Sequence, residues 1–198
     1  IDNFALIAHS MGGMLGTRMA LMLPEKIDKL IMINPIGLEN YLEYVDYKDV
    51  QFFYKNELTK TLKKVRNYQK ENYFDGKWKE KYEKLIEIHR GWIQGPDWKR
   101  VAWNNALTYE MIFSGPVVEE FSKHQVPTSL IIGTRDRTGP GRGWKKEGVK
   151  YKLGQYQILG KKVHQNIDQS ELYELDDLGH LPQFEDFTKF KKAFLKAL

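Results

Sequence analysis

The chain has 198 residues, of which 41% are hydrophobic and 13% aromatic, so it has enough apolar side chains for the core of one domain of ordinary size. It contains no cysteine and no run of 18 or more apolar residues. These absences exclude a disulfide scaffold, a thiolate metal site, a cysteine nucleophile and a membrane-spanning helix.

The first 34 residues predict a strand, a helix and a second strand. Phe4–Ala8 is a continuous apolar run, which is typical of a strand buried on both faces of a parallel sheet. A helical pattern follows and stops at Pro24, and Leu30–Ile33 is the next apolar run. This order is that of a βαβ unit. Because the sequence starts at Ile1 and runs directly into a strand, we expect part of the protein to lie upstream.

Residues 41–115 differ from what precedes them, because they contain helical patterns and no strong strand candidate. Leu58, Leu62 and Val65 follow helical spacing, and Asp97 is placed as the N-cap of a further helix. Residues 55–84 hold ten basic and five acidic side chains and so carry the whole net charge of +5. Since acidic and basic residues alternate there, a solvated helix face is favoured over a site for nucleic acid or a membrane surface.

Sheet character returns after residue 116. Ser129–Gly133 predicts a strand that is followed by a glycine-rich loop, and Glu171–Leu175 predicts a shorter strand after another helix. A final helix is predicted over Phe187–Leu198. The chain therefore divides into two core segments, residues 1–40 and 116–198, and a helical insertion, residues 41–115.

Ser10 is the first candidate for chemistry, because Ala8-His9-Ser10-Met11-Gly12 lies between a predicted buried strand and a predicted helix. Small residues on both sides of a serine allow the sharp turn that lifts its hydroxyl above the edge of a sheet. The first glycine of the G-x-S-x-G pattern is replaced by Ala8. A plain helix N-cap is the alternative role for Ser10.

Two further residues follow predicted strands. Asp136 comes just after Ser129–Gly133, and His180 follows the strand that ends at Leu175. The carboxyl ends of parallel strands meet at one edge of a sheet, so we expect Ser10, Asp136 and His180 to converge there in the order nucleophile, acid, base.

Other residues compete for these roles. Glu39, five residues after Asn34, is the alternative acid, but Asp136 is favoured because it directly follows a strand that ends in glycine. His9 adjoins Ser10 and is expected to point away from it. The five scattered histidines do not have the spacing of a metal site, so no metal is expected.

These motifs resemble the α/β-hydrolase superfamily, and specifically its serine hydrolases with a helical lid. The resemblance is carried by Ala8–Gly13, by Gly133–Asp136 and by Leu178–His180 with Pro182-Gln183 after it. It implies a doubly wound, mostly parallel sheet with about four C-terminal strands present and an inserted lid. It also implies that four strands, and the loop that gives the second oxyanion donor, lie upstream of residue 1.

The resemblance further implies acyl transfer through a Ser10–Asp136–His180 triad without a cofactor, with the backbone N–H of Met11 as one oxyanion donor. A lid over Ser10 should give apolar walls to a small-molecule substrate, and the candidates are Trp92, Trp98 and Trp103. An aminopeptidase or carbon–carbon hydrolase with the same triad remains an alternative, as does a small-molecule receptor on the same fold. A third alternative is a C-terminal fragment that is inactive on its own.

The open flank of Phe4–Ala8, where upstream strands would pack, favours aggregation or pairing into a homodimer. The sequence leaves the compartment undecided between the cytoplasm and export, because a leader would lie upstream of Ile1.

Overall fold

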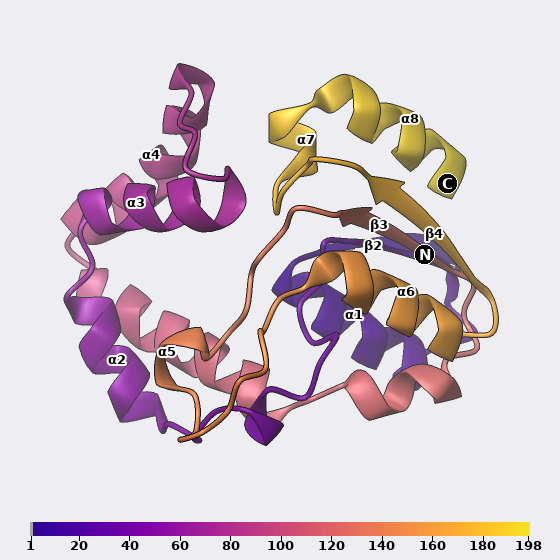
Figure 1. The fold of residues 1–198 in the computed structure, drawn as a ribbon, viewed down its shortest axis with the longest axis horizontal. Coiled ribbons are helices and arrows are strands. Elements are labelled where there is room, and N and C mark those ends of the chain that lie inside the picture. Colours follow the sequence, from indigo (N-terminus) through magenta and orange to yellow (C-terminus); the bar gives the residue numbers. More distant parts are fainter. Residues whose placement is uncertain (1) are drawn as a thin grey trace.

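A computed structural model describes residues 2–198 and shows a four-stranded parallel sheet with helices on its faces (Figure 1). The strands are β1 (Phe4–His9), β2 (Ile27–Ile33), β3 (Thr128–Gly133) and β4 (Ser170–Leu175). They lie in the order β1-β2-β3-β4, and each neighbouring pair is parallel. The predicted fold class is therefore confirmed, and each strand lies within three residues of its predicted position.

The two central strands are buried on both faces, which explains their continuous apolar sequences. Leu30 and Met32 of β2 belong to the larger core cluster, which α6 (Tyr156–Asn166) and α1 (Met11–Met22) complete. Ile31 and Ile33 face the opposite side, where they pack with Phe190 of α8 (Phe187–Ala197). This alternation follows from the two-residue period of a strand.

Strand β1 differs from the prediction of a strand buried on both faces. It forms an edge of the sheet that residues 2–198 build, and it pairs with β2 alone. Ala5 is exposed and Ile7 has 51% of its surface exposed, whereas Ala8 is buried. Helix α8, which covers this face, makes its main contacts with β3 and β4, and this leaves the outer part of β1 exposed.

Four helices between β2 and β3 form a group beyond the carboxyl ends of the strands, and we call residues 41–115 the cap segment (Figure 1). These helices are α2 (Val50–Leu58), α3 (Leu62–Tyr73), α4 (Lys84–Gln94) and α5 (Trp98–Ser114). The remaining helical elements are short: η1 (Tyr41–Glu43), η2 (Glu80–Glu83), η3 (Val118–Lys123), η4 (Arg142–Trp144) and α7 (Pro182–Glu185). Among residues 2–198, no helix combines the length and the apolar character that crossing a membrane requires.

The apolar spacing of Leu58, Leu62 and Val65 spans two helices and not one. The break comes from Thr61, whose hydroxyl accepts a hydrogen bond from the backbone N–H of Lys64 at 3.2 Å and so caps α3. A side chain that satisfies an N–H of the first turn favours a new helix start over continuation. Asp49 caps α2 in the same way.

The glycine-rich loop after β3 packs against the cap segment, although its position in the sequence groups it with the core. Lys145 forms an antiparallel bridge with Val45, and the ring of Tyr151 stacks on that of Tyr44 with 4.0 Å between centroids. Trp144 lies edge-on to Phe52. The loop thereby supplies one wall of the space between the sheet edge and the cap helices.

Candidate functional site

Ser10 lies in a sharp turn between β1 and α1. Its backbone has φ of 55° and ψ of −123°, a conformation that is costly for a residue with a Cβ atom. The turn is held by its own carbonyl oxygen, which accepts hydrogen bonds from the backbone N–H groups of Gly13 at 2.9 Å and Ile36 at 3.0 Å. A Cβ atom on Gly13 would lie 2.2 Å from that of Pro35, so glycine allows α1 to approach this close.

The structure brings Ser10, His180 and Asp136 into one hydrogen-bonded row. The Nε2 atom of His180 lies 2.9 Å from the Ser10 Oγ atom, and its Nδ1 atom lies 2.6 Å from Oδ2 of Asp136. The side chains of His180 and Asp136 are almost completely buried. With the proton on Nδ1 directed at Asp136, Nε2 is free to accept the proton of the Ser10 hydroxyl. This is the geometry that nucleophilic activation of a serine requires.

Asp136 is held by hydrogen bonds from one residue that follows β2 and one in its own loop after β3. The backbone N–H of Thr138 donates to its Oδ1 atom at 2.7 Å, and the Asn34 amide donates to Oδ2 at 2.9 Å. Burial raises the pKa of the Asp136 carboxyl, but the charge and hydrogen bond of His180 and the bonds from Thr138 outweigh burial and hold that pKa below its ordinary value. Asp136 is thus ionised at neutral pH.

Asn34 is a site residue that the sequence analysis missed. It directly follows β2, and its Oδ1 atom accepts a hydrogen bond from the backbone N–H of Gly133 at 3.0 Å. Its side chain therefore ties the end of β2 to the end of β3 while it contacts Asp136. Its position immediately after a buried strand is the signal that could have identified it.

Glu39, the alternative acid, contacts other partners. Its carboxylate accepts hydrogen bonds from the backbone N–H of Gly154 and from the Tyr151 hydroxyl, both at 2.8 Å. Burial raises its pKa. Its bonds hold the loop after β3, and it has no hydrogen bond with His180 among residues 2–198.

Two rings pack against the imidazole of His180. His9 contacts the backbone carbonyl of His180 through Nε2 at 2.9 Å, so it is directed away from the Ser10 hydroxyl. Burial and the neighbouring His180 lower the pKa of His9 to about 4, which keeps its ring neutral at pH 7. Tyr73, at the end of α3, lies with its ring centroid 4.5 Å from that of His180.

A partly buried ion pair between Arg135 and Glu185 of α7 holds the loop that carries His180. Glu185 pairs with Arg135 and accepts a hydrogen bond from the backbone N–H of Gly179 at 2.7 Å. Arg135 in turn donates its backbone N–H to the carbonyl of Leu178 at 3.0 Å. Arg135, which precedes Asp136, is thus connected through Glu185 to Gly179, which precedes His180.

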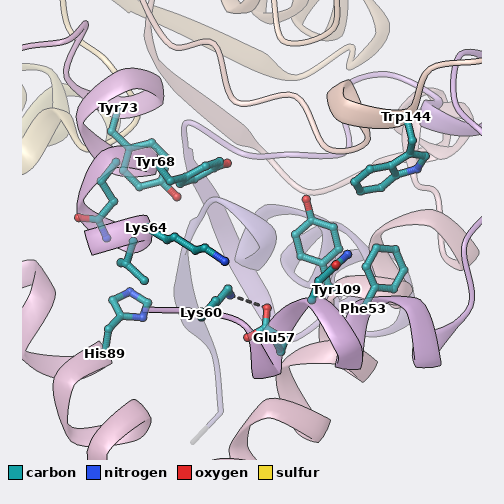
Figure 2. Close-up of a pocket in the computed structure, with 12 residues that line it drawn as sticks. Phe53, Glu57, Lys60, Lys64, Tyr68, Tyr73, His89, Tyr109 and Trp144 are labelled. Atoms are coloured by element: carbon teal, nitrogen blue, oxygen red, sulfur yellow. Dashed lines mark ion pairs between the residues drawn. The ribbon is translucent and has the colours of Figure 1, made fainter. Parts of the chain in front are cut away.

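Two adjoining cavities extend from Ser10 into the cap segment. One, of about 270 Å³, is lined by Ser10 and Met11, and its far wall is formed by α3, α4 and α5. The other, of about 510 Å³, lies among the cap helices and reaches Trp144 (Figure 2). Both are lined by Glu57, Lys60, Tyr68, Tyr73, His89 and Tyr109. The two cavities are therefore neighbours that share these walls.

Of the three predicted lid tryptophans, Trp92 alone lines the cavity at Ser10. Helix α5 contributes Asn105, Thr108, Tyr109 and Ile112 to that cavity. Trp103 lies on the opposite face of the helix and packs edge-on against Tyr54. Trp98 starts the helix, about 10 Å along its axis from Asn105, and lines neither cavity. The expectations for Trp98 and Trp103 therefore disagree with the structure.

Met11, the predicted oxyanion donor, is the first residue of α1 and lines the cavity beside Ser10. The N–H group of a first helical residue has no acceptor within its own helix, so it is free to bind a ligand oxygen. Residues 2–198 contain no group of three or more histidine, cysteine or acidic side chains placed to hold a metal ion.

Comparisons with known proteins bear on the family and the fold. The sequence matches, over residues 1–187, the model of a family described as the alpha/beta hydrolase fold. The crystal structure of a probable hydrolytic enzyme from Pseudomonas aeruginosa PAO1 is 39% identical, with a TM-score of 0.96 over 100% of this chain and 64% of that one. The present chain therefore spans less than two thirds of that protein's length. The comparison with curated proteins gave no match.

More distant structures share the fold. One is 2-hydroxy-6-oxo-6-phenylhexa-2,4-dienoate hydrolase from Rhodococcus sp. strain RHA1, with 13% identity, a TM-score of 0.66, and coverage of 100% of this chain and 64% of that one. Another is the enol-lactonase from Burkholderia xenovorans LB400, with 18% identity, a TM-score of 0.65, and coverage of 100% and 66%.

Proposed function

The chain belongs to the alpha/beta hydrolase fold family, and on this premise we propose that the protein hydrolyses an ester or related acyl bond, with Ser10, His180 and Asp136 as a catalytic triad. The observation that carries the proposal is the unbroken row of contacts, 2.9 Å from Ser10 Oγ to His180 Nε2 and 2.6 Å from His180 Nδ1 to Asp136 Oδ2. The probable hydrolytic enzyme from Pseudomonas supports a hydrolase.

In the first step, His180 Nε2 takes the proton of the Ser10 hydroxyl as Oγ attacks the substrate carbonyl carbon. Asp136 keeps the remaining proton on Nδ1 and stabilises the positive charge that forms on the imidazole. The carbonyl oxygen becomes an oxyanion, for which the Met11 N–H is the donor within reach at the start of α1.

In the second step, the imidazolium gives its proton to the leaving alcohol, and the acyl group stays on Ser10 as an ester. Water then attacks this acyl-enzyme with His180 as the base, which releases the acid and restores the serine. Every proton in the cycle passes through Nε2, the one imidazole nitrogen that faces Ser10.

The cap segment is proposed to enclose the substrate. The far walls of the cavity at Ser10 come from residues between β2 and β3, and Trp92 is among them. A half-enclosed apolar wall excludes water and strengthens hydrogen bonds to the reacting atoms.

Covalent labelling with a fluorophosphonate tests the proposal. The purified protein should be labelled at Ser10, Ser10→Ala should lose the label and lower ester turnover by about 10⁴-fold or more, and the control Ser122→Ala on η3 should behave as wild type. A receptor that binds small molecules without turnover would react weakly or not at all. Full ester hydrolysis by Ser10→Ala would refute the mechanism.

A further inference from the structure

Two lysine side chains extend into the larger cavity from the junction of α2 and α3. Figure 2 shows the ammonium groups of Lys60 and Lys64 directed into the same space. Lys60 is paired with Glu57, a buried carboxylate that also accepts a hydrogen bond from Asn105 at 3.2 Å. The charge of Lys60 is thus balanced by the Glu57 carboxylate in the same cavity wall.

Lys64 has no such partner. Its ammonium contacts the carbonyl oxygen of Thr59 at 2.9 Å and the Thr59 hydroxyl at 3.4 Å, and no carboxylate within 4.0 Å pairs with it among residues 2–198. His89 also lines this wall, and burial and the charge of Lys60 lower its pKa and favour its neutral ring, so it adds no second positive charge beside Lys64. One positive charge of this cavity is therefore left without a counter-charge.

The space between Lys64 and Ser10 has the walls of a substrate site. Tyr68, Tyr73 and Tyr109 line both cavities, and Phe53 and Trp144 close the outer one. Aromatic walls bind an apolar chain or ring, whereas an ammonium at the end of such a space fixes a charged group. The Lys64 side chain is itself exposed, so its ammonium is accessible from solvent.

We propose that the substrate carries a carboxylate, which Lys64 binds in the outer cavity while the scissile carbonyl lies at Ser10. This inference rests on the proposed function and specifies its substrate class: an ester or related acyl compound with an anionic group separated from the reacting carbon by an apolar spacer. Lys64 is then a specificity-determining residue, and Lys60 maintains the local geometry through Glu57.

A matched pair of substrates tests this. 4-Nitrophenyl hydrogen adipate and 4-nitrophenyl methyl adipate share the leaving group and the spacer, and they differ in the charge at the far end. The wild-type protein should show a kcat/KM for the acid at least tenfold above that for the methyl ester, in proportion to one charge-assisted hydrogen bond. Lys64→Gln should remove this preference, so that the kcat/KM values of the two esters lie within about twofold of each other.

Lys63→Gln is the matched control, because Lys63 neighbours Lys64 on α3 and lines neither cavity. It should keep the wild-type preference. Equal rates for the two esters in the wild-type protein, or an unchanged preference in Lys64→Gln, would overturn the inference while leaving the proposed hydrolase intact.

A binding measurement separates this inference from the proposed function. Calorimetric titration with monomethyl adipate should show binding that weakens about tenfold in Lys64→Gln but not in Lys63→Gln, whereas dimethyl adipate should show no such difference. If neither nitrophenyl ester is cleaved but this pattern holds, the anion site stands and the esterase proposal fails. If wild type and Lys64→Gln bind monomethyl adipate with equal affinity, the proposed anion site is wrong.

Discussion

The Tyr73 ring lies over the imidazole of His180, with their centroids 4.5 Å apart and their planes tilted by 31°. This contact joins the last turn of α3 in the cap segment to the loop that follows β4. We expect this contact to restrict the imidazole to the rotation in which Nε2 faces Ser10, which would make Tyr73 a positioning residue that acts through His180.

Replacing Tyr73 should separate packing from hydrogen bonding. Tyr73→Phe keeps the ring and should retain turnover within about twofold, whereas Tyr73→Ala frees the imidazole and should lower kcat roughly tenfold or more on a small ester such as phenyl acetate. Labelling of Ser10 by a fluorophosphonate should slow in the same order. Wild-type turnover in Tyr73→Ala would show that the stacking does not orient His180.

Gly179 is expected to tolerate no side chain, because a Cβ atom there would lie 2.0 Å from the backbone oxygen of Tyr73. Gly179→Ala must move α3 or the His180 loop, and overpacking of this kind costs about 1–3 kcal/mol. Gly91→Ala on α4 is the control, since its Cβ meets no atom within 4 Å and should stabilise by up to about 1 kcal/mol. Urea unfolding measures both. A Gly179→Ala protein as stable as wild type would contradict the contact.

Replacing each carboxylate by the corresponding amide tests whether Asp136 or Glu39 is the acid of the triad. Asp136→Asn presents a donor to Nδ1 and favours the wrong tautomer of His180, so kcat should fall by about 10⁴-fold. Glu39→Gln keeps an oxygen for Gly154 and lies outside the row of contacts, so kcat should stay within about tenfold. Steady-state kinetics measure both variants. If Glu39 supplied the carboxylate, kcat would fall more in Glu39→Gln than in Asp136→Asn.

The depressed pKa of His9 predicts a loss of stability in acid. Its folded-state pKa of about 4 is below the ordinary value of 6.5, so the unfolded chain binds the proton first. Above pH 6.5, His9 is neutral in both states and costs no stability. As the pH falls toward 4, the free energy of unfolding decreases, and the loss due to His9 reaches about 3 kcal/mol at pH 4. Urea midpoints at pH 7.5 and 4.5 should therefore differ less for His9→Gln than for wild type. If the urea midpoint shifts equally between the two pH values in both proteins, His9 is not the cause of the acid destabilisation.

The sequence predicted the sheet and the convergence of Ser10, Asp136 and His180 because both depend on local pattern. A run of apolar residues of strand length reports burial on two faces, as in Leu30–Ile33, and a polar residue after such a run must lie at the sheet edge. The pattern cannot report what covers a face. For that reason it misplaced Ile7, which is apolar and half exposed.

The walls of the cavity could not be predicted in this way. Trp103 and Tyr109 lie on the same helix, and which of them faces Ser10 depends on how α5 is rotated in the cap segment. Similarly, Lys63 and Lys64 are adjacent and chemically identical, and tertiary packing alone determines that the second one lines the cavity.

Each of the four strands ends in a residue of the Ser10 site: Ser10 after β1, Asn34 after β2, and the loops of Asp136 and His180 after β3 and β4. The cavity walls come largely from a different part of the chain, residues 53–112. On the proposed function, the reacting groups and the residues that select the substrate therefore lie in separate parts of the sequence. On the proposed function, libraries that randomise cavity positions on α5 offer a route to new acyl selectivity, because the residues that assemble the row of contacts stay unchanged.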